Sequence, residues 1–178
     1  MSETAANLNG TTALLIPRDI LSAWDLLHGM MLPSGNDAAL ALAEHFGVLL
    51  YSNKYGTKKK LPQSPERYFI NEMNKNATLI KMHYTLFVNP HGLDKEYHNS
   101  CTYDVLKLGH KAMKLKKLKK IVSTISYECN IVGGARPARH IKWENTNGLL
   151  SVDGYNGIKT GITPQRDHVC VHHFAEGK

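Results

Sequence analysis

Residues 24–47, WDLLHGMMLPSGNDAALALAEHFG, contain two apolar helical patterns separated by a proline. In the first half the apolar residues recur at helical spacing, and Pro33 disfavours helical geometry at Leu32, so a first helix is predicted to end there. The apolar stripe of a second helix follows the triplet Ser34–Asn36, and Gly47 suits the C-terminal end of that helix. We therefore predict two helices joined by a tight corner that contains Ser-Gly-Asn.

The polar residues of this corner allow two interpretations. Ser34 followed by Asp37 is a passable helix N-cap pair, and Asn36 is also a good cap, so a plain helix start explains the triplet when it is taken alone. Alternatively, two packed helices hold the corner rigidly enough to present Ser34 and Asn36 as functional groups. The motifs near the C-terminal end of the chain favour the second interpretation.

The composition of the chain predicts one globular domain. It has 178 residues, of which 42% are hydrophobic, and a formal net charge of +7 that suits an anionic substrate or surface. Its three cysteines are widely separated, so we expect free thiols and neither a zinc site nor a disulfide framework, and no metal or organic cofactor. No apolar run reaches transmembrane length, and the first twenty residues show no secretion signal. The sequence assigns neither a cellular compartment nor an oligomeric state.

Residues 50–67 shift in composition and predict a lysine-rich surface loop inserted in this domain. The loop contains the consecutive lysines Lys58–Lys60 and two prolines. We interpret the lysines as a solvated loop tip, with a ligand-binding patch as the alternative. Before the first helix, residues 1–19 are mostly small and polar and predict an extended lead-in.

The middle of the chain predicts helices and one turn. Residues 68–80 carry a helical apolar face, and Asn89–Gly92, Asn-Pro-His-Gly, is a turn after a short extended run. A single long helix is predicted over residues 102–122, with a buried apolar face and a lysine-rich face. Its segment 114–120, KLKKLKK, could contact nucleic acid or anionic lipid. No aromatic residues interleave with these lysines, so we interpret them as a solvated face and expect no nucleic-acid partner.

The last third of the chain predicts a β-hairpin after an irregular segment. Residues 123–147 contain glycines and a proline that are typical of loops. Residues 155–163 predict a strand interrupted by glycines, and residues 169–174 predict a second strand, so the two are expected to form a hairpin. Lys159–Gly161, Lys-Thr-Gly, lies in the first of these strands.

The Ser-Gly-Asn corner and the Lys-Thr-Gly strand match two of the three motifs, Ser-x-x-Lys, Ser-x-Asn and Lys-Thr-Gly, of serine enzymes that recognise penicillin. The surrounding segments match as well, and these are LLHGMMLPSGNDAALALAEHFG, TLFVNPHGLD, ENTNGLL and GYNGIKTGIT. Together they resemble the D-alanyl-D-alanine carboxypeptidase family, the low-molecular-mass penicillin-binding proteins. The resemblance runs from about Ser2 to Cys170 and is broken by the lysine-rich loop.

This resemblance implies a fold and a reaction. The fold is expected to be α+β, the mixed helix–sheet architecture of the penicillin-binding and β-lactamase-like transpeptidases. Residues 1–178 would form a single, partial catalytic domain with a helical part and a C-terminal antiparallel hairpin. The implied activity is hydrolysis of the terminal D-Ala–D-Ala bond of peptidoglycan stem peptides through an acyl-enzyme. The implied ligands are a D-Ala-D-Ala peptide or a β-lactam.

The resemblance also assigns catalytic roles to two residues. Ser34 would relay a proton toward the leaving amine of the substrate. Lys159 would add positive charge beside Ser34 and toward the terminal carboxylate of the substrate.

Four further residues are assigned to substrate binding by the same resemblance. Asn36 would hold the substrate amide, and Thr160 would donate a hydrogen bond to the terminal carboxylate. The strand edge at Gly161 would align the peptide by β-addition, and the backbone N–H of Ile162 would provide one arm of the oxyanion hole.

One motif of the family is absent from this sequence. No Ser-x-x-Lys occurs in the 178 residues, and the residues before Ser34 resemble the part of the family that follows the nucleophile. We therefore expect this polypeptide to be inactive and poorly stable by itself. Two alternatives stay open. One is a non-catalytic relative that binds peptidoglycan or a partner through the same groove, and the other is a basic binder of nucleic acid or membrane that acts through Lys58–Lys60 and Lys111–Lys120.

Overall fold

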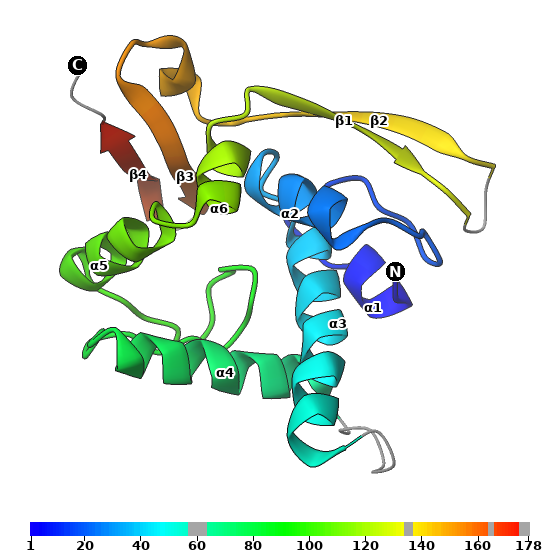
Figure 1. Cartoon of the computed structure of the whole chain (residues 1–178), viewed down its shortest axis with the longest axis horizontal. Helices are drawn as coiled ribbons and strands as arrows, with labels where there is room; N and C mark the ends of the chain where they lie inside the picture. The colour runs from blue at the N-terminus through cyan, green and yellow to red at the C-terminus, as the bar shows by residue number, and fades with distance from the viewer. Residues whose placement is uncertain (57–63, 134–136, 164–165, 175–178) are drawn as a thin grey trace.

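The computed structural model describes residues 1–56, 64–133, 137–163 and 166–174. Within these ranges the helices come first along the chain and two β-hairpins come last (Figure 1). The elements are α1 (Glu3–Ala6), α2 (Ala23–Met31), α3 (Asn36–Tyr55), α4 (Pro65–Leu79), α5 (Thr102–Ala112), α6 (Lys116–Val122), β1 (Ser126–Ile131), β2 (Arg139–Glu144), the 3₁₀ helix η1 (Gly148–Ser151), β3 (Tyr155–Thr163) and β4 (Arg166–Phe174). In this part of the chain, no helix is both long enough and apolar enough to cross a membrane.

The helix–corner–helix prediction is confirmed by α2 and α3. α2 begins after Ser22, whose side chain forms a reciprocal capping box with Asp25, and it ends just before Pro33. Gly35 then precedes the first residue of α3. A Cβ on Gly35 would lie 2.6 Å from the carbonyl oxygen of Gly29 in α2, so only glycine permits so tight a corner.

The predicted end of the second helix at Gly47 is wrong, because α3 continues to Tyr55. Gly47 lies where α4 packs across α3, and a Cβ at this position would lie 2.6 Å from the carbonyl carbon of Pro65. The glycine therefore permits a close contact between two helices and does not end one.

The lysine-rich loop is shorter than the predicted range 50–67. Residues 50–55 belong to α3 and residues 65–67 belong to α4, because the packing of α4 against α3 keeps both segments helical. Lys58–Lys60 lie outside the described residues. The helix predicted over residues 68–80 is confirmed as part of α4.

The single long helix predicted over residues 102–122 is wrong, because it is divided into α5 and α6. Each piece packs against a different part of the last hairpin. A Cβ on Gly109 of α5 would lie 3.1 Å from the side chain of Ile158, and a Cβ on Gly157 would lie 2.6 Å from the side chain of Val122 in α6. The break between the two helices lets α5 pack against β4 while α6 packs against β3.

Two smaller predictions have different outcomes. The lead-in over residues 1–19 is not entirely extended, because Ser2 caps the short helix α1 by accepting a hydrogen bond from Ala5 N–H at 3.0 Å. The turn at Asn89–Gly92 is confirmed, because the Gly92 N–H donates to Asn89 Oδ1 at 2.7 Å.

The irregular structure predicted over residues 123–147 is wrong, because β1 and β2 form an antiparallel hairpin there. Tyr127 pairs with Trp143 and Cys129 with Ile141, and these residues alternate with exposed ones at the two-residue period of a strand. The inward face of this hairpin packs on α2. The main core consists of Ala13, Leu15, Leu32, Ala38, Ile121, Cys129, Ile131, Ile141 and Trp143.

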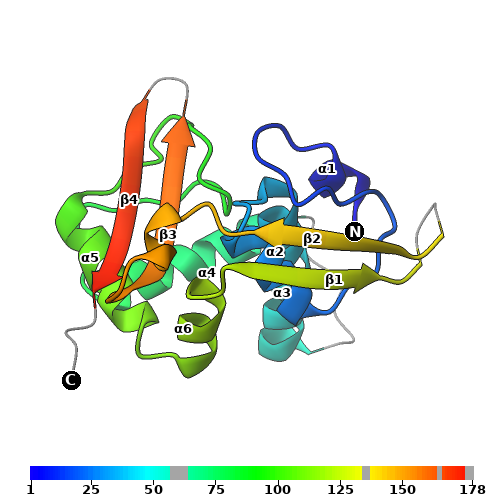
Figure 2. The ribbon, with the colours of Figure 1, turned by 90° about the horizontal axis from the view of Figure 1, so that it is seen from above.

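The second hairpin is confirmed by the antiparallel pairing of β3 and β4. Lys159 lies opposite Val171, and Thr160 lies opposite Cys170. Figure 2 shows this hairpin standing beside α5 and α6, whereas β1 and β2 cross α2 and α3. The edge of β3 away from β4 pairs with no other strand among the described residues.

Candidate active site

The corner between α2 and α3 holds Ser34 in an unusual backbone conformation. Its φ of +63° lies in the left-handed region, which non-glycine residues adopt rarely and which is enriched at functional sites. The Ser34 carbonyl accepts a hydrogen bond from Thr11 Oγ1 at 2.5 Å, and the Gly35 N–H donates to the Gly29 carbonyl at 3.0 Å. Ser34 is half-buried, and within the described residues its Oγ makes no hydrogen bond, which leaves the hydroxyl available to a ligand.

A plain helix cap does not explain this corner. The N-cap of α3 is Gly35, and no side chain forms a capping hydrogen bond there. The buried carboxylate of Asp37 instead accepts hydrogen bonds from the Thr12 hydroxyl at 2.6 Å and from the N–H groups of Ala13 at 2.8 Å and Leu15 at 3.1 Å. Asp37 therefore ties the preceding segment to the corner and makes the corner rigid.

Asn36 is buried beside the loop that precedes this segment. Its side chain is 5% exposed, and its Nδ2 donates to the Asn9 carbonyl at 3.0 Å. A Cβ on Gly10 would lie 2.5 Å from Nδ2, so the loop packs directly on the amide. Oδ1 of Asn36 has no hydrogen-bond partner in the part of the chain that is described. Its predicted contact with a substrate amide stays a prediction.

Lys159 lies half-buried on β3. Its Nζ donates to the Thr160 carbonyl at 2.8 Å. Burial lowers the pKa of the Lys159 ammonium to about 8, an effect that the neighbouring Cys170 opposes. The group therefore keeps its charge at neutral pH and loses it in mildly alkaline solution. Among the described residues no hydrogen bond joins Nζ to Ser34 Oγ, and the predicted cooperation of the two stays a prediction.

Thr160, Gly161 and Ile162 follow Lys159 on the same strand. The Thr160 side chain is half-buried and Gly161 is exposed, opposite Val169 of β4. Ile162 continues the backbone of β3 toward its end. These three positions therefore offer one hydroxyl and a row of backbone groups along a single strand.

Thr146, to which the sequence assigned no role, joins the corner to this strand. Its backbone N–H donates to the carbonyl of Leu32, which lies two residues before Ser34, at 3.1 Å. Its Oγ1 lies 3.3 Å from the same carbonyl oxygen and 2.6 Å from Thr160 Oγ1. One side chain thus links the Ser-Gly-Asn corner to the Lys-Thr-Gly strand. The only signal for it in the sequence is its place in the segment ENTNGLL.

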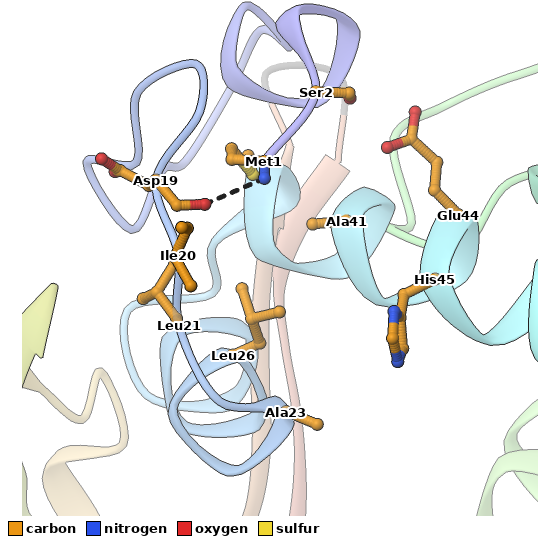
Figure 3. Close-up of a pocket in the computed structure, with 10 residues that line it drawn as sticks. All are labelled: Met1, Ser2, Asp19, Ile20, Leu21, Ala23, Leu26, Ala41, Glu44 and His45. Atoms are coloured by element: carbon orange, nitrogen blue, oxygen red, sulfur yellow. Dashed lines mark hydrogen bonds between the residues drawn. The ribbon is translucent and has the colours of Figure 1, made fainter. Parts of the chain in front are cut away.

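The cavity drawn in Figure 3 lies away from these residues. It has a volume of about 320 Å³, and its wall includes Leu26 of α2 and both Ala41 and Glu44 of α3. The amino group of Met1 donates to the Asp19 carbonyl at 2.9 Å along another side. None of the six predicted site residues lines this cavity. In the described ranges, no cluster of three or more His, Cys, Asp or Glu side chains is arranged to hold a metal ion.

Comparison with known proteins points to one family. The D-alanyl-D-alanine carboxypeptidase family matches residues 58–177 of this chain. The chain is 34% identical over 167 residues to a D-alanyl-D-alanine carboxypeptidase of Streptomyces sp. strain K15, a match that covers 93% of this chain and 54% of that protein. It is 30% identical over 163 residues to the D-alanyl-D-alanine carboxypeptidase DacF of Bacillus subtilis strain 168, which covers 91% of this chain and 37% of that protein.

The solved structures agree with these relatives. The crystal structure of the Streptomyces K15 DD-transpeptidase matches with a TM-score of 0.81 at 34% identity, and the match covers 95% of this chain and 62% of that chain. The predicted fold class, a partial fold of the penicillin-binding type, is thereby confirmed. The chain spans about half the length of its Streptomyces relative and 37% of the length of DacF.

Proposed function

The chain belongs to the D-alanyl-D-alanine carboxypeptidase family, and on that premise we propose that it is the substrate-binding part of a serine D-Ala-D-Ala carboxypeptidase. The proposed reaction removes the terminal D-Ala of peptidoglycan stem peptides through an acyl-enzyme. The proposal is carried by one observation, which is the path from Leu32 through Thr146 to Thr160: the Thr146 N–H donates to the Leu32 carbonyl at 3.1 Å, and Thr146 Oγ1 lies 2.6 Å from Thr160 Oγ1. This path connects the two family motifs that the chain contains, at residues that are far apart in the sequence.

The terminal carboxylate of the substrate is assigned to Thr160 and Lys159. The Thr160 hydroxyl would donate a hydrogen bond to it, and the ammonium of Lys159 would balance its charge. Because burial already lowers the pKa of Lys159 to about 8, a bound carboxylate would raise that pKa and keep the ammonium protonated. The affinity for the carboxylate is therefore expected to fall as the pH rises above about 8.

The backbone of the substrate is assigned to the open edge of β3 and to Asn36. An extended peptide would add as a strand beside Gly161, and the Ile162 N–H would face the scissile carbonyl as one arm of an oxyanion hole. The Oδ1 of Asn36, which has no partner among the described residues, would accept a hydrogen bond from a substrate amide, while Nδ2 donates one of its two protons to the Asn9 carbonyl.

Ser34 is assigned the relay of a proton to the leaving amine. A hydroxyl can accept one proton while it donates another, so it transfers a proton without becoming charged. Its left-handed backbone and the hydrogen bond from Thr11 to its carbonyl hold the backbone that carries this hydroxyl in place. Because Oγ makes no hydrogen bond within the described residues, the hydroxyl is available to relay a proton to the leaving amine of a bound peptide.

Formation of the acyl-enzyme needs a nucleophile with a base within hydrogen-bond reach. The 178 residues contain no Ser-x-x-Lys motif that would supply this pair. We therefore propose that this polypeptide by itself binds the peptide without acylation. The same absence predicts that a fluorescent penicillin leaves no covalent label on it.

The test is a titration of the chain with an acylated tripeptide that ends in D-Ala-D-Ala, followed through the backbone amide NMR shifts. We expect the amide shifts to change at the Ser-Gly-Asn corner and along β3. We also expect the isomer that ends in L-Ala-L-Ala to bind more weakly than the D-Ala-D-Ala peptide. Thr160→Val is expected to weaken binding about tenfold or more, the usual loss for one hydrogen bond to a charged group. Equal binding of the two isomers, or shifts confined to the cavity of Figure 3, would overturn the proposal.

A further inference from the structure

We propose that Thr146 is a positioning residue that orients the hydroxyl proton of Thr160 toward the terminal carboxylate of a bound peptide, and thereby makes the site select a free acid. The inference rests on the proposed function, because it concerns the same ligand. It adds a determinant of specificity that lies outside both family motifs.

The segment around Thr146 is fixed before any ligand binds. The Asn145 N–H donates to the Ile125 carbonyl at 2.8 Å, and the Asn145 Nδ2 donates to the Thr124 carbonyl at 3.0 Å. The Asn147 N–H in turn donates to Asn145 Oδ1 at 3.0 Å. Thr146 is therefore held between the end of α6 and the end of α2, and its hydroxyl has a defined position opposite Thr160.

The position of the hydroxyl proton on Thr146 determines the position of the hydroxyl proton on Thr160. At 2.6 Å, one of Thr146 Oγ1 and Thr160 Oγ1 must donate to the other. In the first arrangement Thr160 donates to Thr146, which donates to the Leu32 carbonyl at 3.3 Å, and no proton faces a ligand. In the second arrangement Thr146 gives up its side-chain hydrogen bond to the Leu32 carbonyl and donates its single proton to Thr160, whose own proton then faces outward.

A carboxylate selects the second arrangement. It has only acceptor atoms when ionised, so it binds well only where Thr160 offers its proton. A donation from Thr146 also polarises the Thr160 hydroxyl and strengthens the hydrogen bond that it makes to an anion. A C-terminal amide carries both donor and acceptor atoms, so it can form a hydrogen bond with Thr160 in either arrangement. Its affinity therefore depends less on Thr146.

The variant Thr146→Val removes the hydroxyl and keeps the shape of the side chain and the backbone hydrogen bond to Leu32. Thr146→Ser keeps the hydroxyl and serves as the matched control. The ligands are an acylated tripeptide ending in D-Ala-D-Ala, as the free acid and as the C-terminal amide, and their affinities are measured by NMR titration. We expect Thr146→Val to lower the affinity for the free-acid peptide about threefold to tenfold and to change the affinity for the amide less than about twofold. Thr146→Ser is expected to restore the preference for the acid.

The amide distinguishes a loss of orientation from a loss of structure. If Thr146→Val weakens both peptides equally, or leaves the ratio of acid to amide affinity unchanged, the proposed role of Thr146 is overturned while the proposed function stands. If the parent chain binds neither peptide, the proposed function and the role of Thr146 both fall.

A double-mutant cycle tests the hydroxyl pair without a ligand. The free energies of unfolding are measured for the parent, Thr146→Val, Thr160→Val and the double variant. If the double variant loses a different amount of stability from the sum of the two single variants, the hydrogen bond between the two side chains is supported. If the two losses add fully, this hydrogen bond is overturned.

Discussion

Gly47 in α3 lies against the backbone of Pro65 at the start of α4, and a Cβ on Gly47 would come within 2.6 Å of the Pro65 carbonyl carbon. No rotamer change relieves such a clash, because the neighbour is backbone. The crossing of the two longest helices therefore depends on the absence of one methyl group.

Gly47→Ala is predicted to destabilise the chain by about 2 kcal/mol or more, because the helices must move apart. Helix propensity alone predicts the opposite sign, a gain of about 1 kcal/mol for alanine in a helix interior. Urea unfolding followed by circular dichroism decides between the two. Gly148→Ala is the control, since a Cβ there would contact nothing within 4 Å, and it is expected to change stability by less than about 0.5 kcal/mol.

Asp37→Asn is predicted to destabilise the chain by about 3 kcal/mol, because the new NH₂ group would face donors that now bond to the carboxylate. The donors affected are the Thr12 hydroxyl and the N–H groups of Ala13 and Leu15. The free energy of unfolding provides the measurement. The exposed Asp153→Asn is the control, and an equally small effect of both variants would contradict the anchoring role of Asp37.

Lys159→Met is predicted to stabilise the chain at neutral pH, with the gain shrinking as the pH rises. The pKa of Lys159 is about 8 in the folded chain, below the 10.5 of an ordinary lysine. Between these values the unfolded chain binds more protons than the folded one, so the Lys159 contribution to the free energy of unfolding increases with pH. Unfolding is measured for parent and variant across this range, since the difference between them cancels the other titrating groups. A difference that does not vary with pH would contradict the lowered pKa.

Cys170 is predicted to react with a maleimide in the folded chain, and Cys129 only after unfolding. Cys170 is exposed, whereas Cys129 is 2% exposed and burial raises the pKa of its thiol to about 11. Reaction requires an accessible thiolate, and Cys129 is hidden from the reagent and also kept protonated by its raised pKa. Mass spectrometry of peptides from native and denatured protein measures the two rates, with Cys170→Ser as the control. Comparable native rates at the two sites would contradict the burial of Cys129.

Several elements could be predicted because their signals are local. Pro33 ends α2 through a clash with its own neighbour, and the glycine-interrupted run 155–163 carries the pattern of a strand. The β1–β2 hairpin was missed although its alternating burial follows a two-residue period, because the glycines and proline between the strands suggested loops. Here two local signals conflicted, and the packing of Trp143 on α2 favoured the strands.

The candidate site divides in the same way. Ser34, Asn36 and the Lys-Thr-Gly strand were found by their motifs and spacing, which can be read from the sequence without any tertiary structure. Their roles rest on the resemblance and on the proposal built from it. Thr146 has no such motif, and its importance lies in contacts with Leu32 and Thr160 that exist only after folding.

The linear order of residues was enough to indicate the family through its motifs and to predict the helix–corner–helix unit and the last hairpin, because the signals of these two elements are local. The length of α3, the division of residues 102–122 and the link at Thr146 depend on segments that meet only in space. Leu32 and Thr146 are 114 positions apart, and no local preference specifies a hydrogen bond over that separation. It forms because β1, β2 and α6 pack on α2 and carry Thr146 to the end of that helix.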